Sequence, residues 1–166
     1  MGLDITAYKN LKKVENPILD EWGELKNWET EWKPGESMEW SEKHFPGRGE
    51  GIEPDSVYTF EEEFGFRAGS YSGYNWWRDH LYKFALALMK INEKINPFEE
   101  LVNFADNEGV IGYVVAEKLK NDFVTHEEMA KKYSKKLQDG EWWLDKYNDW
   151  KKAFILASQN GAVDFH

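Results

Sequence analysis

The chain has 166 residues, no cysteine, and 31 Asp and Glu against 21 Lys and Arg, which gives a formal net charge of −10. The absence of cysteine excludes disulfides, thiolate metal sites and a cysteine nucleophile. The acidic balance argues against a duplex nucleic-acid partner, because such a partner requires a basic footprint. No apolar run approaches the roughly 18 residues of a membrane span. We therefore expect a single domain over 1–166 with no membrane partner.

The first 70 or so residues are expected to be rich in β-structure. Residues 3–14 read as a strand. Residues 16–42 interleave four tryptophans with eight acidic residues and lack a helical period, so short strands or an irregular excursion is expected there. Residues 45–55 are expected to form a glycine-proline loop. In residues 56–67 apolar and polar residues partly alternate, which predicts a strand pair or one bent strand.

The rest of the chain is expected to be helical. A long helix is predicted to begin near Asn75, with apolar residues at helical spacing through Leu88. Asn96, Pro97 and Glu99 form a typical helix start, and that helix should stop near Gly109. Three further helices are expected over 111–123, 126–137 and 143–154. The predicted fold class is α+β, with a β-rich N-terminal part of about 70 residues packed on a helical C-terminal portion of about five helices.

The arginines are concentrated in one window of the sequence. The chain has only three, Arg48, Arg67 and Arg78, and five of its 13 glycines lie in the same window. Arginine grips phosphate or carboxylate with a planar fork of donors, and glycine lets backbone approach a ligand closely. This clustering favours an anion site, and ordinary surface ion pairs are the alternative.

The sharpest local motif runs from Arg67 to Arg78, where a strand ends, a Gly/Ser turn follows and a helix begins. Free backbone N–H groups and the helix dipole favour an anion at such a point, and tyrosine and tryptophan rings offer stacking faces for a base. The alternative is an ordinary capped helix start, with Asn75 as the N-cap. No catalytic residue, metal or cofactor is assigned. The predicted ligand-binding set is Arg48, Arg67, Ser70, Tyr71, Ser72, Gly73, Tyr74, Trp76, Arg78 and His80.

Evidence for catalysis in the sequence is thin. His80 is the best general acid or base candidate, and a helix N-terminus disfavours its charged form. His44 lies before the glycine-rich loop that carries Arg48, and this loop either closes over a ligand or is a mobile surface loop. The sequence therefore leans against an enzyme.

Several motifs resemble a family of small phage and prophage proteins of uncertain function. They are the start Met1–Tyr8, the segment Ser70–Tyr74 running into Trp77-Arg78, the segment Phe104–Gly112 and the end Gly161–His166. The resemblance implies a counter-defence factor in the cytoplasm of an infected bacterial host. It carries no catalytic residues, because the family has no established activity.

The leading functional expectation is a non-enzymatic sponge that binds and sequesters a small phosphorylated nucleotide immune signal. The first alternative is an acidic protein-binding inhibitor of a host factor, a nucleic-acid mimic, which presents residues 20–42 to a basic surface. The second alternative is a small nucleotide hydrolase. The expected partner is thus a small anionic nucleotide, and a homo-oligomer is compatible with the sequence.

Overall fold

A four-stranded antiparallel sheet with the order β5-β1-β7-β6 lies at the centre of the computed structural model, which describes residues 1–166. Its strands are β1 (Gly2–Lys9), β5 (Glu62–Ser70), β6 (Gly109–Gly112) and β7 (Ala162–Phe165). Side chains alternate between the two faces of a strand. Leu3, Ile5 and Ala7 of β1 are therefore buried on one face, while Asp4 and Thr6 remain partly exposed on the other.

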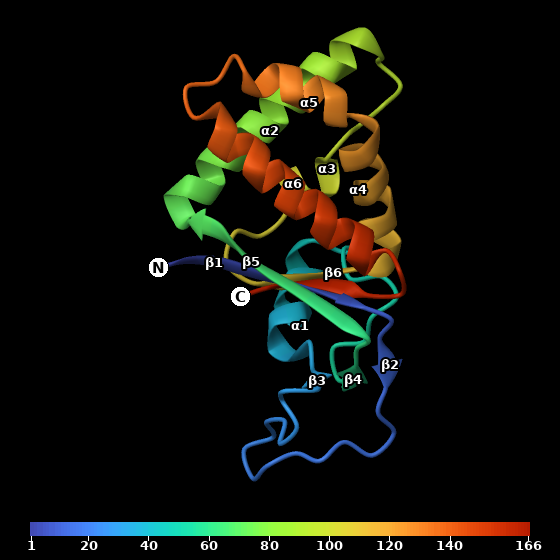
Figure 1. The fold of residues 1–166 in the computed structure, drawn as a ribbon. Helices are drawn as coiled ribbons and strands as arrows, with labels where there is room; N and C mark the ends of the chain where they lie inside the picture. Colours follow the sequence, from blue (N-terminus) through green and yellow to red (C-terminus); the bar gives the residue numbers. More distant parts are fainter.

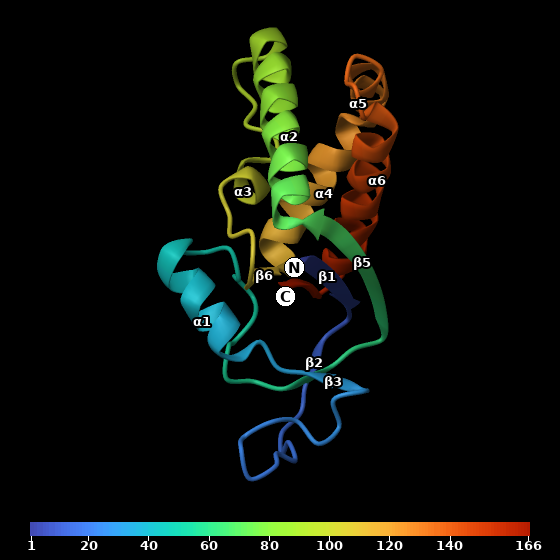
Figure 2. The same ribbon diagram turned by 90° about the vertical axis from the view of Figure 1, so that its left-hand side faces the viewer.

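Five helices follow β5 in the chain and lie on one side of this sheet; α2, α4 and α6 pack against it, whereas α3 and α5 pack against these helices (Figures 1 and 2). They are α2 (Tyr71–Ile91), α3 (Glu99–Val102), α4 (Tyr113–Thr125), α5 (Glu127–Ser134) and α6 (Gly140–Ala157). The predicted α+β class, with a β-rich beginning and a helical remainder, is confirmed.

Tryptophans on α2 and α6 form the centre of the core. Trp77, Trp143 and Trp150 are fully buried. The indole N–H of Trp77 donates to the Trp143 carbonyl at 3.0 Å, and the indole N–H of Trp143 donates to the Trp77 carbonyl at 3.2 Å. The indole N–H groups of Trp77 and Trp143 thus find the partners that a buried N–H requires, whereas the indole N–H of Trp150 has no hydrogen-bond partner.

A smaller three-stranded sheet with the order β2-β4-β3 extends from the other end of the molecule. Its strands are β2 (Lys12–Lys13), β3 (Glu31–Trp32) and β4 (Tyr58–Thr59). Trp32 is buried against Tyr8 and Tyr58, with ring centroids 4.9 Å and 6.0 Å away. Its indole N–H donates to the Asp164 carboxylate of β7 at 3.2 Å, so this tryptophan joins the two sheets.

The long helix begins four residues earlier than the sequence predicts, at Tyr71 rather than Asn75. Ser70 is the N-cap, because its Oγ accepts the N–H of Gly73 at 3.0 Å. Asn75 lies one turn inside the helix and donates its side-chain amide to the Tyr71 carbonyl at 2.9 Å. The Gly/Ser segment is therefore the first helical turn and not a separate loop.

Four other elements differ from the expectation. Residues 35–44 form a helix, α1 (Gly35–His44), which packs against β6 on the face of the sheet away from the other helices. Phe98 adopts a left-handed conformation, with φ 64°, and its N–H donates to Asp122, so α3 starts at Glu99 and is only four residues long. Strands β6 and β7 lie within the half of the chain expected to be helical, and each is too short for alternation to reveal it.

None of the helices combines the length and the apolar composition needed to cross a membrane.

We expect Leu81→Ala to reduce the free energy of unfolding by about 2–5 kcal/mol, because the side chain is fully buried and its removal leaves a cavity. Leu86→Ala on the same helix is the matched control, since Leu86 is 39% exposed. Urea denaturation measures both. Equal losses in the two variants would contradict the assignment of the core face.

Burial raises the pKa of the Asp164 carboxyl to about 7, because the hydrogen bond from Trp32 only partly offsets its desolvation. The folded state thus binds a proton more tightly than the unfolded state, and stability falls as pH rises from about 4 to about 7. We expect Asp164→Asn to be more stable than the wild type by on the order of 1 kcal/mol or more above this window, and the gain to disappear below it. Urea denaturation at about pH 4 and about pH 8 tests this. A gain that is the same at both pH values would contradict it.

Candidate functional site

Two of the three arginines converge on one short segment, residues 100–104, at the end of α3. The guanidinium of Arg48 donates to the carbonyls of Glu100 at 3.0 Å and Asn103 at 3.1 Å. The guanidinium of Arg78 donates to the carbonyl of Phe104 at 2.5 Å. Carbonyls at the end of a helix lack intrahelical partners, and the planar donor fork of arginine satisfies them. These two arginines therefore stabilise the end of α3.

Arg78 also belongs to a polar cluster on α2. Its second donor reaches the side-chain oxygen of Asn75 at 2.7 Å, and its charge lies over the Tyr74 ring, 5.1 Å from the centroid. Asn75 in turn donates to the carboxylate of Asp106 at 2.9 Å.

Arg67 is placed differently from the other two arginines. It lies on β5 and makes a 3.0 Å ion pair with Asp4 of β1, and both side chains are about half exposed. Each arginine thus has a partner within the protein. The partner of Arg67 is Asp4, which hydrogen-bonds to neither Arg48 nor Arg78.

The other predicted residues lie along the first turns of α2. Ser70 and Ser72 are exposed, with their hydroxyl oxygens 3.3 Å apart. Tyr74 is fully buried and stacks on Trp77, so its ring is not accessible to a base. Tyr71 is half-buried against the core. The prediction that this set binds a ligand stays a prediction.

Trp76 and Gly73 are the predicted residues that line a surface hollow. The Trp76 ring contacts His80 at 4.5 Å and Trp142 of α6 at 5.9 Å between centroids. Together with Gly73 and Asp139, the two tryptophans line a hollow of about 470 Å³. Trp142 and Asp139 are not among the predicted residues. The signal was present, because helical spacing that buries Trp143 places its neighbour Trp142 at the edge of the core.

The histidines do not form an acid-base pair. Burial lowers the pKa of His80, and its ring has no hydrogen-bonded carboxylate. His44 contacts the Trp40 carbonyl of its own helix at 2.9 Å. No group of three His, Asp or Glu side chains is arranged to hold a metal ion.

A second candidate site lies at the end of the molecule formed by residues 14–30, between β2 and β3, which we call the acidic loop. Five of its residues are acidic and one is a lysine. Its turn is fixed by Asp20, whose Oδ1 accepts the backbone N–H groups of Trp22 at 2.8 Å and Glu24 at 2.9 Å. Gly23 has φ 82°, a value that favours glycine. The acidic loop is therefore a built turn with a defined tip.

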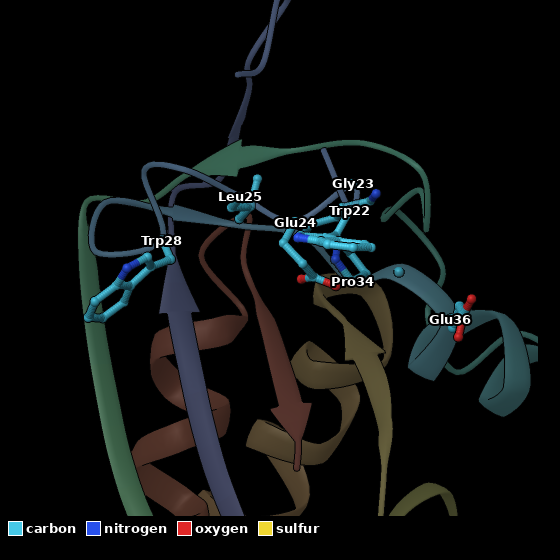
Figure 3. A pocket seen from close by; sticks show the side chains of 9 residues that line it. Trp22, Gly23, Glu24, Leu25, Trp28, Pro34 and Glu36 are labelled. Atoms are coloured by element: carbon cyan, nitrogen blue, oxygen red, sulfur yellow. The ribbon is translucent and has the colours of Figure 1, made fainter. Parts of the chain in front are cut away.

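The acidic loop displays large apolar side chains. Trp22 is 80% exposed, Trp28 is 70% exposed, and Ile18 is 55% exposed. In Figure 3, Trp22 lies beside Glu24 and Pro34, whereas Trp28 stands apart on the other side of the loop. The hollow between the loop and the start of α1 has a volume of about 670 Å³. It is lined by Trp22, Gly23, Glu24, Leu25, Trp28, Lys33, Pro34, Gly35 and Glu36.

Comparison with known proteins gives no relative, since no protein-family model, no curated protein and no solved structure matches the chain. The functional argument therefore rests on the residues of this chain.

The arginine contacts predict unequal effects on stability. We expect Arg78→Ala to reduce the free energy of unfolding by about 1.5–3 kcal/mol, because it leaves the Phe104 carbonyl and the Asn75 side chain without their charged donor. Arg67→Ala should cost only about 0–1 kcal/mol, because its ion pair is half exposed.

Urea denaturation of both variants measures this difference, and Arg78→Lys should recover only part of the loss because lysine lacks the planar fork. An Arg67 variant that is destabilised as much as the Arg78 variant would contradict the assigned roles.

Proposed function

We propose that this protein is a non-enzymatic binder of another protein, and that the acidic loop captures a basic surface of its partner. The observation that carries this proposal is the display of Trp22 and Trp28, which are 80% and 70% exposed. Trp22 lies on the turn held by Asp20, and Trp28 lies on a separate turn in which the N–H of Thr30 donates to the Asn27 carbonyl at 3.0 Å. A tryptophan buries about 150–250 Å² when it is covered. Two indoles left in water carry an unfavourable hydration free energy, which a partner that covers them would remove.

The physical features of the acidic loop match those of a protein interface. Tryptophan is among the residues enriched at interface hot spots. The Asp20 turn holds the tip in place before binding, which reduces the entropy lost on association. The carboxylates of Glu21, Glu24 and Glu29 surround the two indoles in sequence and steer a basic partner toward them.

A basic surface that accepts carboxylates and aromatic rings is also what a nucleic-acid-binding protein presents. We therefore infer an inhibitor that occupies such a surface in place of phosphates and bases. Within the phage context that the sequence motifs imply, the target would be a host factor. This context rests on the resemblance alone, and the role of the acidic loop does not depend on it.

Nucleotide sequestration is the second candidate function. The observation that favours it is the hollow beside the first turn of α2, where the rings of Trp76 and Trp142 are available for stacking. The nearest arginines are already bonded within the protein, and Asp139 adds negative charge at the rim. Titration calorimetry of cyclic and ADP-ribose-type nucleotides against the wild type and Trp76→Ala tests this function.

We expect Trp22→Ala combined with Trp28→Ala to abolish capture of the partner in a pull-down from host lysate, because alanine removes both apolar anchors. Tyr82→Ala is the matched control, since Tyr82 is 46% exposed on α2 far from the loop. Replacing Glu24, Glu29, Glu31 and Glu36 with Gln should also weaken capture, and raised salt should weaken capture by the wild type. Retention of the same partner by the double tryptophan variant would overturn the proposal.

A further inference from the structure

A second unpartnered surface lies at the other end of the molecule, between the C-terminal half of α2 and α5. It is a groove of about 170 Å³, which we call the lysine groove. Its lining is Phe84, Ala87, Leu88, Ile91, Met129, Lys132, Tyr133 and Lys136. Most of these side chains are apolar, and the two lysines stand at its edge on the α5 side.

The lysine groove exposes apolar surface and unpaired positive charge together. Ile91 is 75% exposed and Met129 is 40% exposed. Lys132 and Lys136 are exposed and make no ion pair with any carboxylate of the chain. A surface of this kind suits a segment that offers one large apolar side chain between carboxylates.

The acidic loop is such a segment. Its turn places Trp22 between Glu21 and Glu24, on the tip that Asp20 fixes. The groove has about the volume of one large side chain, and its lysines carry the charge opposite to that of the loop.

The loop of one chain cannot occupy the groove of the same chain. Figures 1 and 2 show the acidic loop at one end of the molecule and the α2–α5 end at the other, with the central sheet between them. Any contact between these two surfaces must therefore join two copies.

We propose that the protein self-associates head to tail, with the acidic loop of one copy in the lysine groove of the next. Trp22 lies against Ile91 and Met129 of the second copy, and Glu21 and Glu24 face its Lys132 and Lys136. This inference rests on the proposed role of the acidic loop as a docking surface. The contact is heterologous, so each copy keeps one free loop and one free groove, and association continues beyond a dimer. One turn in one groove buries a small area, so the association is weak and depends on concentration.

Sedimentation velocity on the purified full chain tests the proposal. We expect the sedimentation coefficient of the wild type to rise with protein concentration at 0.1 M salt, where the screening length is about 10 Å, and to stay at the monomer value at 1 M salt, where it is about 3 Å. Two variants each lack one surface: Trp22→Ala with Trp28→Ala lacks the loop anchors, and Lys132→Glu with Lys136→Glu reverses the charge of the groove. Each variant alone should remain a monomer.

The mixture of the two variants is the decisive sample. The loop variant keeps an intact groove and the groove variant keeps an intact loop, so an equimolar mixture should form a dimer and nothing larger. Ile91→Asp, at a side chain that is already 75% exposed, serves as an independent groove variant and should behave like the lysine pair. A wild type that stays monomeric at about 1 mM, or a mixture in which no dimer forms, would overturn the proposal. Because sedimentation of the pure chain uses no other protein, this failure is distinct from a failure of partner capture in the lysate pull-down.

Discussion

The reciprocal hydrogen bonds between Trp77 and Trp143 are the contact on which the helical layer depends. Each indole N–H lies in a region without water, so it must donate to protein or lose the energy of a hydrogen bond. Each donates to the backbone carbonyl of the other tryptophan. Two such bonds fix the distance between α2 and α6 and their relative rotation. Trp150 of α6 is then directed onto the sheet, where it packs against Phe66 of β5 and Phe165 of β7.

A second tryptophan contact joins this core to the end of the molecule that carries the acidic loop. Trp32 belongs to β3, the strand that follows the loop, and is buried between Tyr8 and Tyr58, with its indole N–H donating to Asp164. Removing this carboxyl from water raises its pKa to about 7. Ionisation of the buried carboxyl therefore lowers the free energy of unfolding as the pH rises. The stability of the acidic loop and the ionisation of Asp164 are therefore coupled.

The sequence predicts the features that depend on periodicity and misses those that depend on tertiary partners. The spacing of Trp77, Leu81, Phe84 and Leu88 identifies the buried face of α2, because that face repeats over many turns. Helix α1 has no such repeat, since only Met38 and Ser41 are buried along it, and so it could not be recognised. The start of α2 depends on which of two polar residues caps it, and Ser70 does so because strand β5 ends there. The short α3 depends on Phe98 and Asp122, which are far apart in sequence.

The candidate site shows the same limit for charged residues. The clustering of arginines predicts an anion site, whereas in the structure Arg48 and Arg78 donate to the carbonyls of residues 100–104. Whether a donor fork faces a ligand or a helix end depends on the tertiary fold, which spacing does not encode. Lys132 and Lys136 show the reverse case, because in the sequence they resemble ordinary solvated charges. In the structure they border an exposed apolar groove. Each end of the molecule therefore has unpaired charge beside uncovered apolar surface, an arrangement that favours association with another protein. The charge is negative at the acidic loop and positive at the lysine groove.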